Sequence, residues 1–162
     1  MRAFLHLVPV LLLATACSSS SGGSGGGGSS DAFVGTWSCM GSSTTTFSQP
    51  PNTPPSTMNT AATVVITDDG MGNITSVRTP EEAGAPCTLH AKLSSDGKST
   101  TIAMGQTCTS PSGGTVTYMS GGSTLTSPST YSSTSTWTYS GTTMKGMPLI
   151  GTGSGMSTCT KK

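Results

Sequence analysis

Short runs of alternating apolar and polar residues recur along this chain, and residues typical of turns separate them. Alternation with a period of two is the pattern of a strand that buries one face. It predicts strands over 36–46, 61–67, 74–78, 87–93, 115–120, 131–139, 143–150 and 155–160. The fold class is therefore all-β: a single antiparallel barrel or sandwich of about eight strands.

One predicted hairpin brings two cysteines together. The strand that begins at Cys87 ends at a turn signal in 94–98, and Cys108 lies on the return strand. The loop falls at either Gly97-Lys98 or Asp96-Gly97, and the two registers differ by two residues. Because a shift of two residues leaves the same side chains on the same face, both registers predict a Cys87–Cys108 disulfide.

The remaining pair, Cys39 and Cys159, lies on the first and last predicted strands. An even number of cysteines in an exported chain is typical of disulfides, and zinc sites need closer pairs. A meander of strands that closes on itself would bring these two residues together. We therefore predict a Cys39–Cys159 disulfide that staples the domain.

Composition makes these bridges important. Hydrophobic residues are 32% and charged residues 8% of the chain, so the core is thin. The longer loop closed by a disulfide would contribute about 5 kcal/mol and the shorter about 3 kcal/mol, against typical total stabilities of about 5–15 kcal/mol. Seven Lys and Arg nearly balance six Asp and Glu, which leaves no basic surface for nucleic acid.

The chain begins with Arg2, an apolar run over 4–13, and small residues that lead to Cys17. The segment Leu13-Ala14-Thr15-Ala16-Cys17 resembles the lipobox of bacterial lipoprotein precursors. This resemblance implies that Cys17 becomes the lipid-modified first residue, held in the membrane by its acyl chains. The alternative is an ordinary secretory signal, cleaved after Ala16, that leaves Cys17 as a plain thiol.

The same resemblance sets the domain organisation and the location. Residues 1–16 form the signal peptide, 17–30 the lipidated cysteine with a Gly/Ser tether, and 31–162 the β-barrel-like domain. A segment made of Gly and Ser cannot bury apolar surface and acts as a flexible linker. Ser18 stands where an aspartate often retains lipoproteins at the inner membrane, so we expect attachment to the cell outer membrane.

The start of the body resembles two envelope families. Phe33-Val34-Gly35-Thr36-Trp37 is similar to the Gly-x-Trp entry strand of lipocalin-like barrels. This resemblance implies a small-molecule cavity inside the barrel, and the alternative is a packed sandwich with Trp37 in its core. The segment 37–41 also faintly resembles the first strand of periplasmic lysozyme-inhibitor lipoproteins, which implies inhibition of a protein.

Catalytic and metal-binding patterns are weak. No Gly-x-Ser-x-Gly elbow is present, and His90, the one histidine after the signal peptide, alternates with residues of the polar face. Met144 and Met147 fit gap-filling better than copper binding, and Asp68, Asp69 and Asn73 fit a turn better than calcium binding. We assign no catalytic residue, no metal and no cofactor.

The sequence thus predicts a lipid-anchored outer-membrane protein that is monomeric, non-catalytic and free of nucleic acid. Its body is expected to act as a binding module for a small lipophilic ligand. The alternative is a structural or inhibitor lipoprotein that meets an envelope protein with its outer surface and holds no internal ligand. The ligand-binding residues are unknown at this level.

Overall fold

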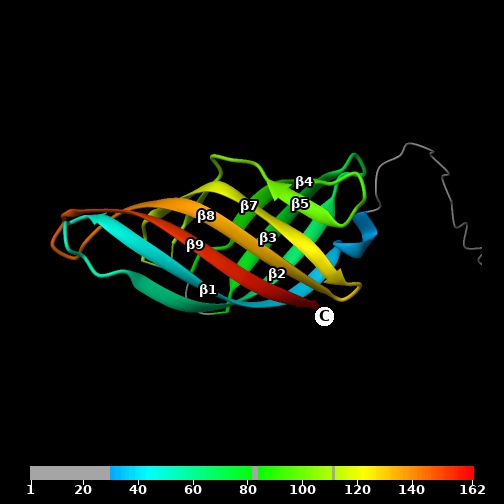
Figure 1. Cartoon of the computed structure of the whole chain (residues 1–162), viewed down its shortest axis with the longest axis horizontal. Helices are drawn as coiled ribbons and strands as arrows, with labels where there is room; N and C mark the ends of the chain where they lie inside the picture. The colour runs from blue at the N-terminus through cyan, green and yellow to red at the C-terminus, as the bar shows by residue number, and fades with distance from the viewer. Residues whose placement is uncertain (1–29, 82–83, 111) are drawn as a thin grey trace, which may run out of the picture.

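The computed structural model describes residues 30–81, 84–110 and 112–162 and is built almost entirely of strands. The predicted signal peptide and Cys17 lie outside these residues. A short 3-10 helix and nine strands follow one another (Figure 1): η1 (Ser30–Ala32), β1 (Gly35–Gln49), β2 (Ser56–Asp68), β3 (Asn73–Pro80), β4 (Cys87–Leu93), β5 (Ser99–Ile102), β6 (Thr107–Thr109), β7 (Thr115–Ser127), β8 (Thr130–Thr142) and β9 (Pro148–Lys161).

The strands close into a barrel. Each pairs antiparallel with its neighbours in the order β5-β4-β3-β2-β1-β9-β8-β7-β6, and an additional pairing between β5 and β7 completes the ring. Eight strands form the wall, while β6 pairs with the first residues of β7. The prediction of an antiparallel all-β fold of about eight strands is confirmed, and the barrel replaces the sandwich alternative.

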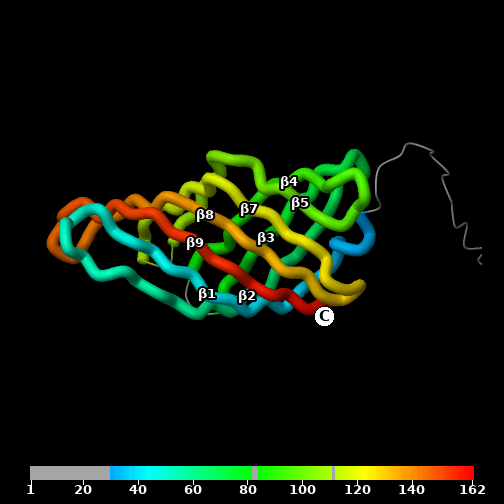
Figure 2. The backbone as a smooth tube through the Cα atoms, in the orientation of Figure 1, coloured from blue at the N-terminus to red at the C-terminus, as the bar shows by residue number. Residues whose placement is uncertain are grey.

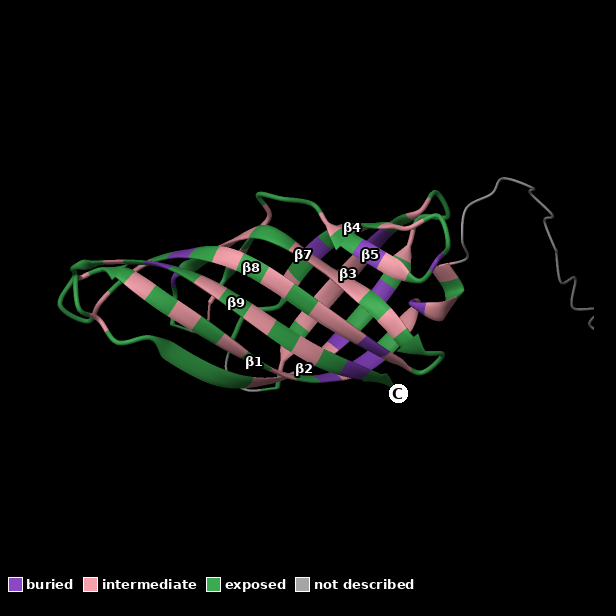
Figure 3. Ribbon diagram, in the orientation of Figure 1, coloured by how far each residue is buried: buried purple, intermediate pink, exposed green. Residues whose placement is uncertain are grey.

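The two ends of the barrel differ. The β1–β2 and β8–β9 hairpins project together at the end opposite the C-terminus, whereas η1 lies near the C-terminus (Figure 2). Burial alternates along most strands, and the fully buried residues gather mainly toward the C-terminal end of the barrel (Figure 3). The core there consists of Phe33, Trp37, Cys39, Val64, Ile66, Ile74, Tyr131 and Cys159.

Both disulfides join the predicted partners. Cys39 and Cys159 lie directly opposite each other on β1 and β9, with their Cα atoms 4.0 Å apart. Cys87 on β4 is bonded to Cys108 on β6, with Cα atoms 5.4 Å apart. The β4–β5 hairpin adopts the register with the Asp96-Gly97 loop, since Leu93 pairs with Thr100.

The strand predicted over 115–120 ends too early, because β7 continues through Gly121 and Gly122 to Ser127. The two glycines are needed where β5 and β8 approach β7. A Cβ atom on Gly122 would lie 2.3 Å from the Thr100 carbonyl oxygen, and one on Gly121 would lie 2.9 Å from the Thr134 carbonyl oxygen. These glycines therefore let β5 join β7 and complete the barrel.

The last two predicted strands are also corrected. Residues 143–147 form a turn, and one long strand, β9, replaces the separate runs 143–150 and 155–160. Gly151, Gly153 and Gly155 occupy inward positions of β9 opposite Tyr139, Trp137 and Ser135. The missing side chains of Gly153 and Gly155 leave room for the Trp137 ring of β8, and that of Gly151 for the Thr46 carbonyl oxygen of β1.

We expect loss of the Cys39–Cys159 disulfide to destabilise the fold more than loss of Cys87–Cys108. The first closes a loop of 120 residues and the second a loop of 21 residues. A Cys39→Ala/Cys159→Ala variant should lose about 4–5 kcal/mol of unfolding free energy, and the matched Cys87→Ala/Cys108→Ala variant about 3 kcal/mol. Urea unfolding measures both losses. A larger loss in the Cys87→Ala/Cys108→Ala variant would contradict the greater contribution of the disulfide between β1 and β9.

Candidate functional site

One end of the barrel is plugged by aromatic side chains. Phe33 and Trp37 are fully buried, and the indole Nε1 of Trp37 donates a hydrogen bond to the Phe33 carbonyl oxygen at 2.8 Å. Tyr131 packs edge-on against Trp37 with ring centroids 4.7 Å apart. The Ser30 hydroxyl donates to Asp68 and so fastens η1 over this end. The plugged end, defined by these residues, is dry core.

Tyr131 has an unusual environment within the plugged end. Its hydroxyl donates to the Cys39 sulfur, with the two atoms 3.5 Å apart. Burial raises the pKa of Tyr131 to about 12, and the positive charge of Arg78 opposes that increase. The phenol therefore stays protonated in the folded protein well above the pH at which an exposed tyrosine ionises.

Above the plugged end, the inward positions become small and polar on four neighbouring strands. This middle layer consists of Gly41 and Ser43 on β1, Gly121 and Ser123 on β7, Ser133 and Ser135 on β8, and Gly155 and Ser157 on β9. All of these residues are half-buried although they point inward. These residues therefore keep part of their surface accessible to solvent.

The far half of the barrel, from Thr45 to Phe47 on β1 and from Trp137 to Tyr139 on β8, has aromatic walls. A Cβ atom on Gly153 would lie 2.3 Å from the Trp137 Nε1 atom, so the indole lies directly over this glycine. Tyr118 packs against Trp137 with ring centroids 6.4 Å apart, and Phe47 packs against Tyr139 at 6.0 Å. Since Trp137, Tyr118 and Phe47 are half-buried, the far half is accessible to solvent.

A charged side chain also occupies an inward position. On β3, Arg78 has the same parity as the buried Ile74, and it pairs with Val64 of β2 and Cys87 of β4. Sequence analysis missed this residue. The signal was present, because the alternation over 74–78 places Arg78 on the face of Ile74.

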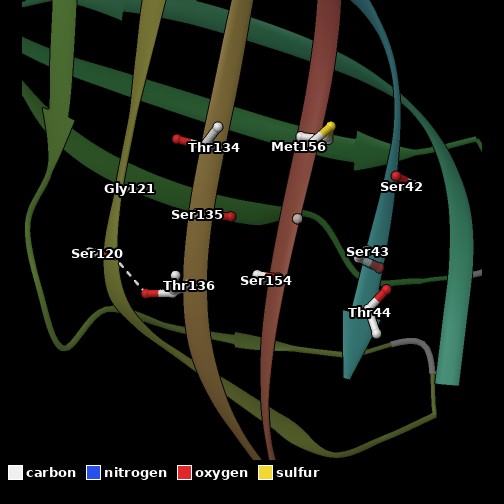
Figure 4. A pocket seen from close by; sticks show the side chains of 11 residues that line it. Ser42, Ser43, Thr44, Ser120, Gly121, Thr134, Ser135, Thr136, Ser154 and Met156 are labelled. Atoms are coloured by element: carbon white, nitrogen blue, oxygen red, sulfur yellow. Dashed lines mark hydrogen bonds between the residues drawn. The ribbon is translucent and has the colours of Figure 1, made fainter. Parts of the chain in front are cut away.

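The outer wall carries two hollows. The first, of about 310 Å³, crosses β7, β8, β9 and β1 and is lined almost entirely by Ser, Thr and Gly (Figure 4). Its outward side chains include Thr134 and Met156, and Ser120 and Thr136 share a hydrogen bond of 2.7 Å. This shallow hollow offers many hydroxyl groups and no charge.

The second hollow, of about 710 Å³, lies on the outside of β4 and β5 and contains His90 and Lys92. The prediction that His90 faces outward is confirmed, because it is exposed and its Nδ1 lies 3.2 Å from the Thr75 hydroxyl. The Gln106 side chain forms the hydrogen bonds with β4 that a neighbouring strand would form. Its amide oxygen accepts from the His90 N–H at 2.6 Å, and its amide nitrogen donates to the His90 carbonyl oxygen at 2.8 Å. These contacts are structural.

Candidate metal ligands remain apart. The described residues contain no group of three or more His, Cys, Asp and Glu side chains that could hold a metal ion. Asp69 accepts hydrogen bonds from the Met71 and Asn73 backbones in the β2–β3 turn, as turn chemistry predicts. Met144 is fully exposed in the β8–β9 turn and Met147 is exposed at its end, so neither fills a gap in the core as the sequence predicted. Within the described ranges, no helix has the length and apolar character to cross a bilayer.

Comparisons with known proteins give distant structural likenesses. No protein-family model matches the chain, and no curated protein matches it. A protein of unknown function from the DUF3598 family of Nostoc punctiforme is 14% identical over 83% of this chain and 49% of that chain, with a TM-score of 0.37. The S-type phycobiliprotein lyase CPES from Guillardia theta is 11% identical over 82% and 90%, with a TM-score of 0.41.

A mutant of the vaccine antigen Transferrin Binding Protein B from Haemophilus parasuis is 12% identical over 83% of this chain and 29% of that chain, with a TM-score of 0.37. The chain thus spans about half the length of the first of these proteins and under a third of the third. At such low similarity, no function is transferred. The eight-stranded up-and-down barrel that the strand pairing defines is itself the architecture of lipocalins.

We expect Tyr131 to make stability fall at alkaline pH. Its folded pKa of about 12 lies above the ordinary value of 10.0, so the stabilisation is complete below pH 10.0 and is lost as the pH rises to about 12. The loss should be on the order of 2 kcal/mol. Urea unfolding should show that the free energy of unfolding falls between about pH 9 and about pH 11, and that Tyr131→Phe reduces this fall. Equal falls in the wild type and the variant would contradict this prediction.

Proposed function

We propose that this protein is a lipid-anchored envelope protein whose barrel binds a small lipophilic ligand without catalysing a reaction. The observation that carries the proposal is the contrast inside the barrel. The end at Trp37 is fully packed, whereas inward aromatic side chains such as Trp137 and Tyr118 are only half-buried. Eight-stranded barrels are either filled by their own side chains or hold one small ligand.

The walls of the far half suit an apolar guest. Trp137, Tyr118 and Phe47 offer large flat surfaces, and aromatic side chains contribute strongly to binding when they are buried by a ligand. The plugged end provides a rigid floor, because the Cys39–Cys159 bridge and the packing around Trp37 join five strands there. A ligand would therefore enter from the end at which the β1–β2 and β8–β9 hairpins project.

The envelope location is supported by the sequence. Leu13-Ala14-Thr15-Ala16-Cys17 resembles a lipobox, and two disulfides require an oxidising compartment. We propose attachment to the outer membrane through Cys17, with the Gly/Ser segment 18–29 as the linker to the body. The protein would act as a monomer and need no nucleic acid, metal or cofactor.

A non-catalytic role is supported by the position of the one histidine of the body. His90 lies on the outer wall beside Thr75, whereas the interior offers Ser, Thr, Tyr and Arg side chains. A serine nucleophile needs a base within hydrogen-bond distance. The inward serines instead contact one another, as in the 3.1 Å hydrogen bond between Ser133 and Ser157.

The second candidate function uses the outer surface. The hollow of about 310 Å³ across β1, β9, β8 and β7 offers hydroxyl groups from neighbouring strands. Such a surface could contact an envelope polymer or protein through hydrogen bonds, as expected for a structural or inhibitor lipoprotein. The internal and external candidates are separated by variants on opposite sides of the same strand.

Thr45 and Thr44 provide this test, because Thr45 faces inward and lies outside the hollow, whereas the neighbouring Thr44 faces outward and lines it. The fluorescent probe 11-(dansylamino)undecanoate should bind the soluble body with enhanced emission. Thr45→Phe should weaken that binding by at least about tenfold, since a large side chain fills the far half of the barrel, and Thr44→Phe should leave it unchanged. Circular dichroism verifies that both variants fold, and the opposite pattern would favour the external surface.

Lipidation is tested separately. In cells given labelled palmitate, the wild-type chain should carry the label and Cys17→Ser should lose it, because acylation requires the cysteine sulfur and the new N-terminus. A Ser18→Ala variant is the matched control and should keep the label. A labelled Cys17→Ser protein, or an unlabelled wild type, would contradict the anchor.

A further inference from the structure

We propose that Arg78 binds the carboxylate head of the ligand inside the barrel, so that the ligand is an amphiphile with an anionic head and an apolar tail. Tyr118 would donate a second hydrogen bond to the same head. This inference rests on the proposed internal binding function and specifies the class of ligand. It follows from the strand register, from the lack of side-chain hydrogen bonds to Arg78 and Tyr118 within the described residues, and from the aromatic walls of the far half.

The register places Arg78 inside the barrel. Along β3 it shares a face with Ile74, which is 2% exposed, and Ser76. Its neighbours across the sheet are Val64, which belongs to the core face of β2, and Cys87 of β4. In the closed ring β3 lies opposite β8, so the long side chain extends toward the strand that carries Tyr131 and Trp137.

Electrostatics place the guanidinium between the two halves of the barrel. The charge of Arg78 acts on the hydroxyls of both Tyr131, in the plugged end, and Tyr118, which packs against Trp137 in the far half. In each case burial raises the tyrosine pKa and Arg78 opposes this. Both phenols therefore remain protonated; the Tyr131 hydroxyl donates to the Cys39 sulfur, and the Tyr118 hydroxyl is left to donate near the cation.

The guanidinium of Arg78 has no hydrogen bond and no ion pair with any residue in the described part of the chain. Tyr118 likewise has no side-chain hydrogen bond there. Both are half-buried, and no polar side-chain atom within the described residues is sealed from solvent without a partner. The guanidinium and the phenol thus face an interior that water reaches, with donors available to a ligand.

An unpaired cation inside a barrel is costly to stability. Burial of a charge without a partner is unfavourable, and apolar side chains of similar size are often more stable at such positions. Among the described residues, its inward neighbours Ser76, Val64 and Cys87 carry no counter-charge. Binding of an anion would supply that missing counter-charge.

The chemistry of the site favours a carboxylate. The planar fork of an arginine matches the two oxygens of one carboxylate, and a neutral tyrosine hydroxyl adds a further donor. One positive charge balances one negative charge, whereas a phosphate dianion would remain unbalanced. Because the plugged end blocks one direction, the tail must extend past Trp137 and Phe47 toward the projecting hairpins.

The test compares two probes that differ in the head alone: 11-(dansylamino)undecanoate and its methyl ester. The wild-type body should bind the acid at least about tenfold more tightly than the ester, since a charge-assisted hydrogen bond is lost in the ester. Equal affinities would overturn the inference and leave the proposed internal site standing. Binding of neither probe would overturn both.

Variants then assign the preference to Arg78. Arg78→Met should lower affinity for the acid at least about tenfold and leave the ester unaffected, and Arg78→Lys should retain part of the preference. Tyr118→Phe should weaken binding of the acid several-fold. The matched control is Lys92→Met, which removes a cation from the outer face of β4 and should change neither affinity.

Stability supplies a readout that a purely structural role would not give. If Arg78 serves the ligand, the Tm of Arg78→Met without probe should equal or exceed that of the wild type. Probe acid should raise the Tm of the wild type and not that of the variant. A large fall in Tm for both Arg78→Met and Arg78→Gln would show that the arginine supports the fold, which would overturn the inference.

Discussion

Closure of the barrel between its first and last strands is the constraint on which the rest of the structure depends. Cys39 and Cys159 meet directly across β1 and β9, and both are almost fully buried. Their bond lies in the core with Trp37 and Tyr131, so the covalent seam and the apolar packing reinforce each other. A chain with 32% hydrophobic residues has little other apolar surface with which to hold its ends together.

Glycine solves a second problem that closure creates. Where β5 meets β7, the wall is completed by a short pairing, and Gly122 allows the Thr100 carbonyl to approach. On β9, the absence of side chains at Gly153 and Gly155 gives the Trp137 ring its place. Close approaches of this kind are a recurrent reason for glycine within strands. Glycines therefore allow the backbones of β5 and β7 to approach closely and leave space on β9 for the Trp137 ring.

Alternation in the sequence was sufficient for the fold class, most strands and both disulfides. The pairing followed because cysteines at inward positions of neighbouring strands have few other partners. Sequence reasoning failed at Gly121-Gly122 and over 143–155, since glycine favours turns locally and only the closed barrel shows why it belongs within a strand. Arg78 was missed for a related reason: its parity was visible, but the meaning of that face depended on the strands opposite.

The interior combines two regions with opposite physical demands. The plugged end lowers the free energy of the fold through apolar packing around Trp37, whereas the far half keeps aromatic surface partly accessible to solvent. A barrel built for stability alone would distribute apolar side chains along its whole interior and would not place Arg78 at an inward position. The segregation indicates that one half supplies stability so that the other can remain incompletely satisfied. Groups left without partners in a folded protein are those available to bind something else.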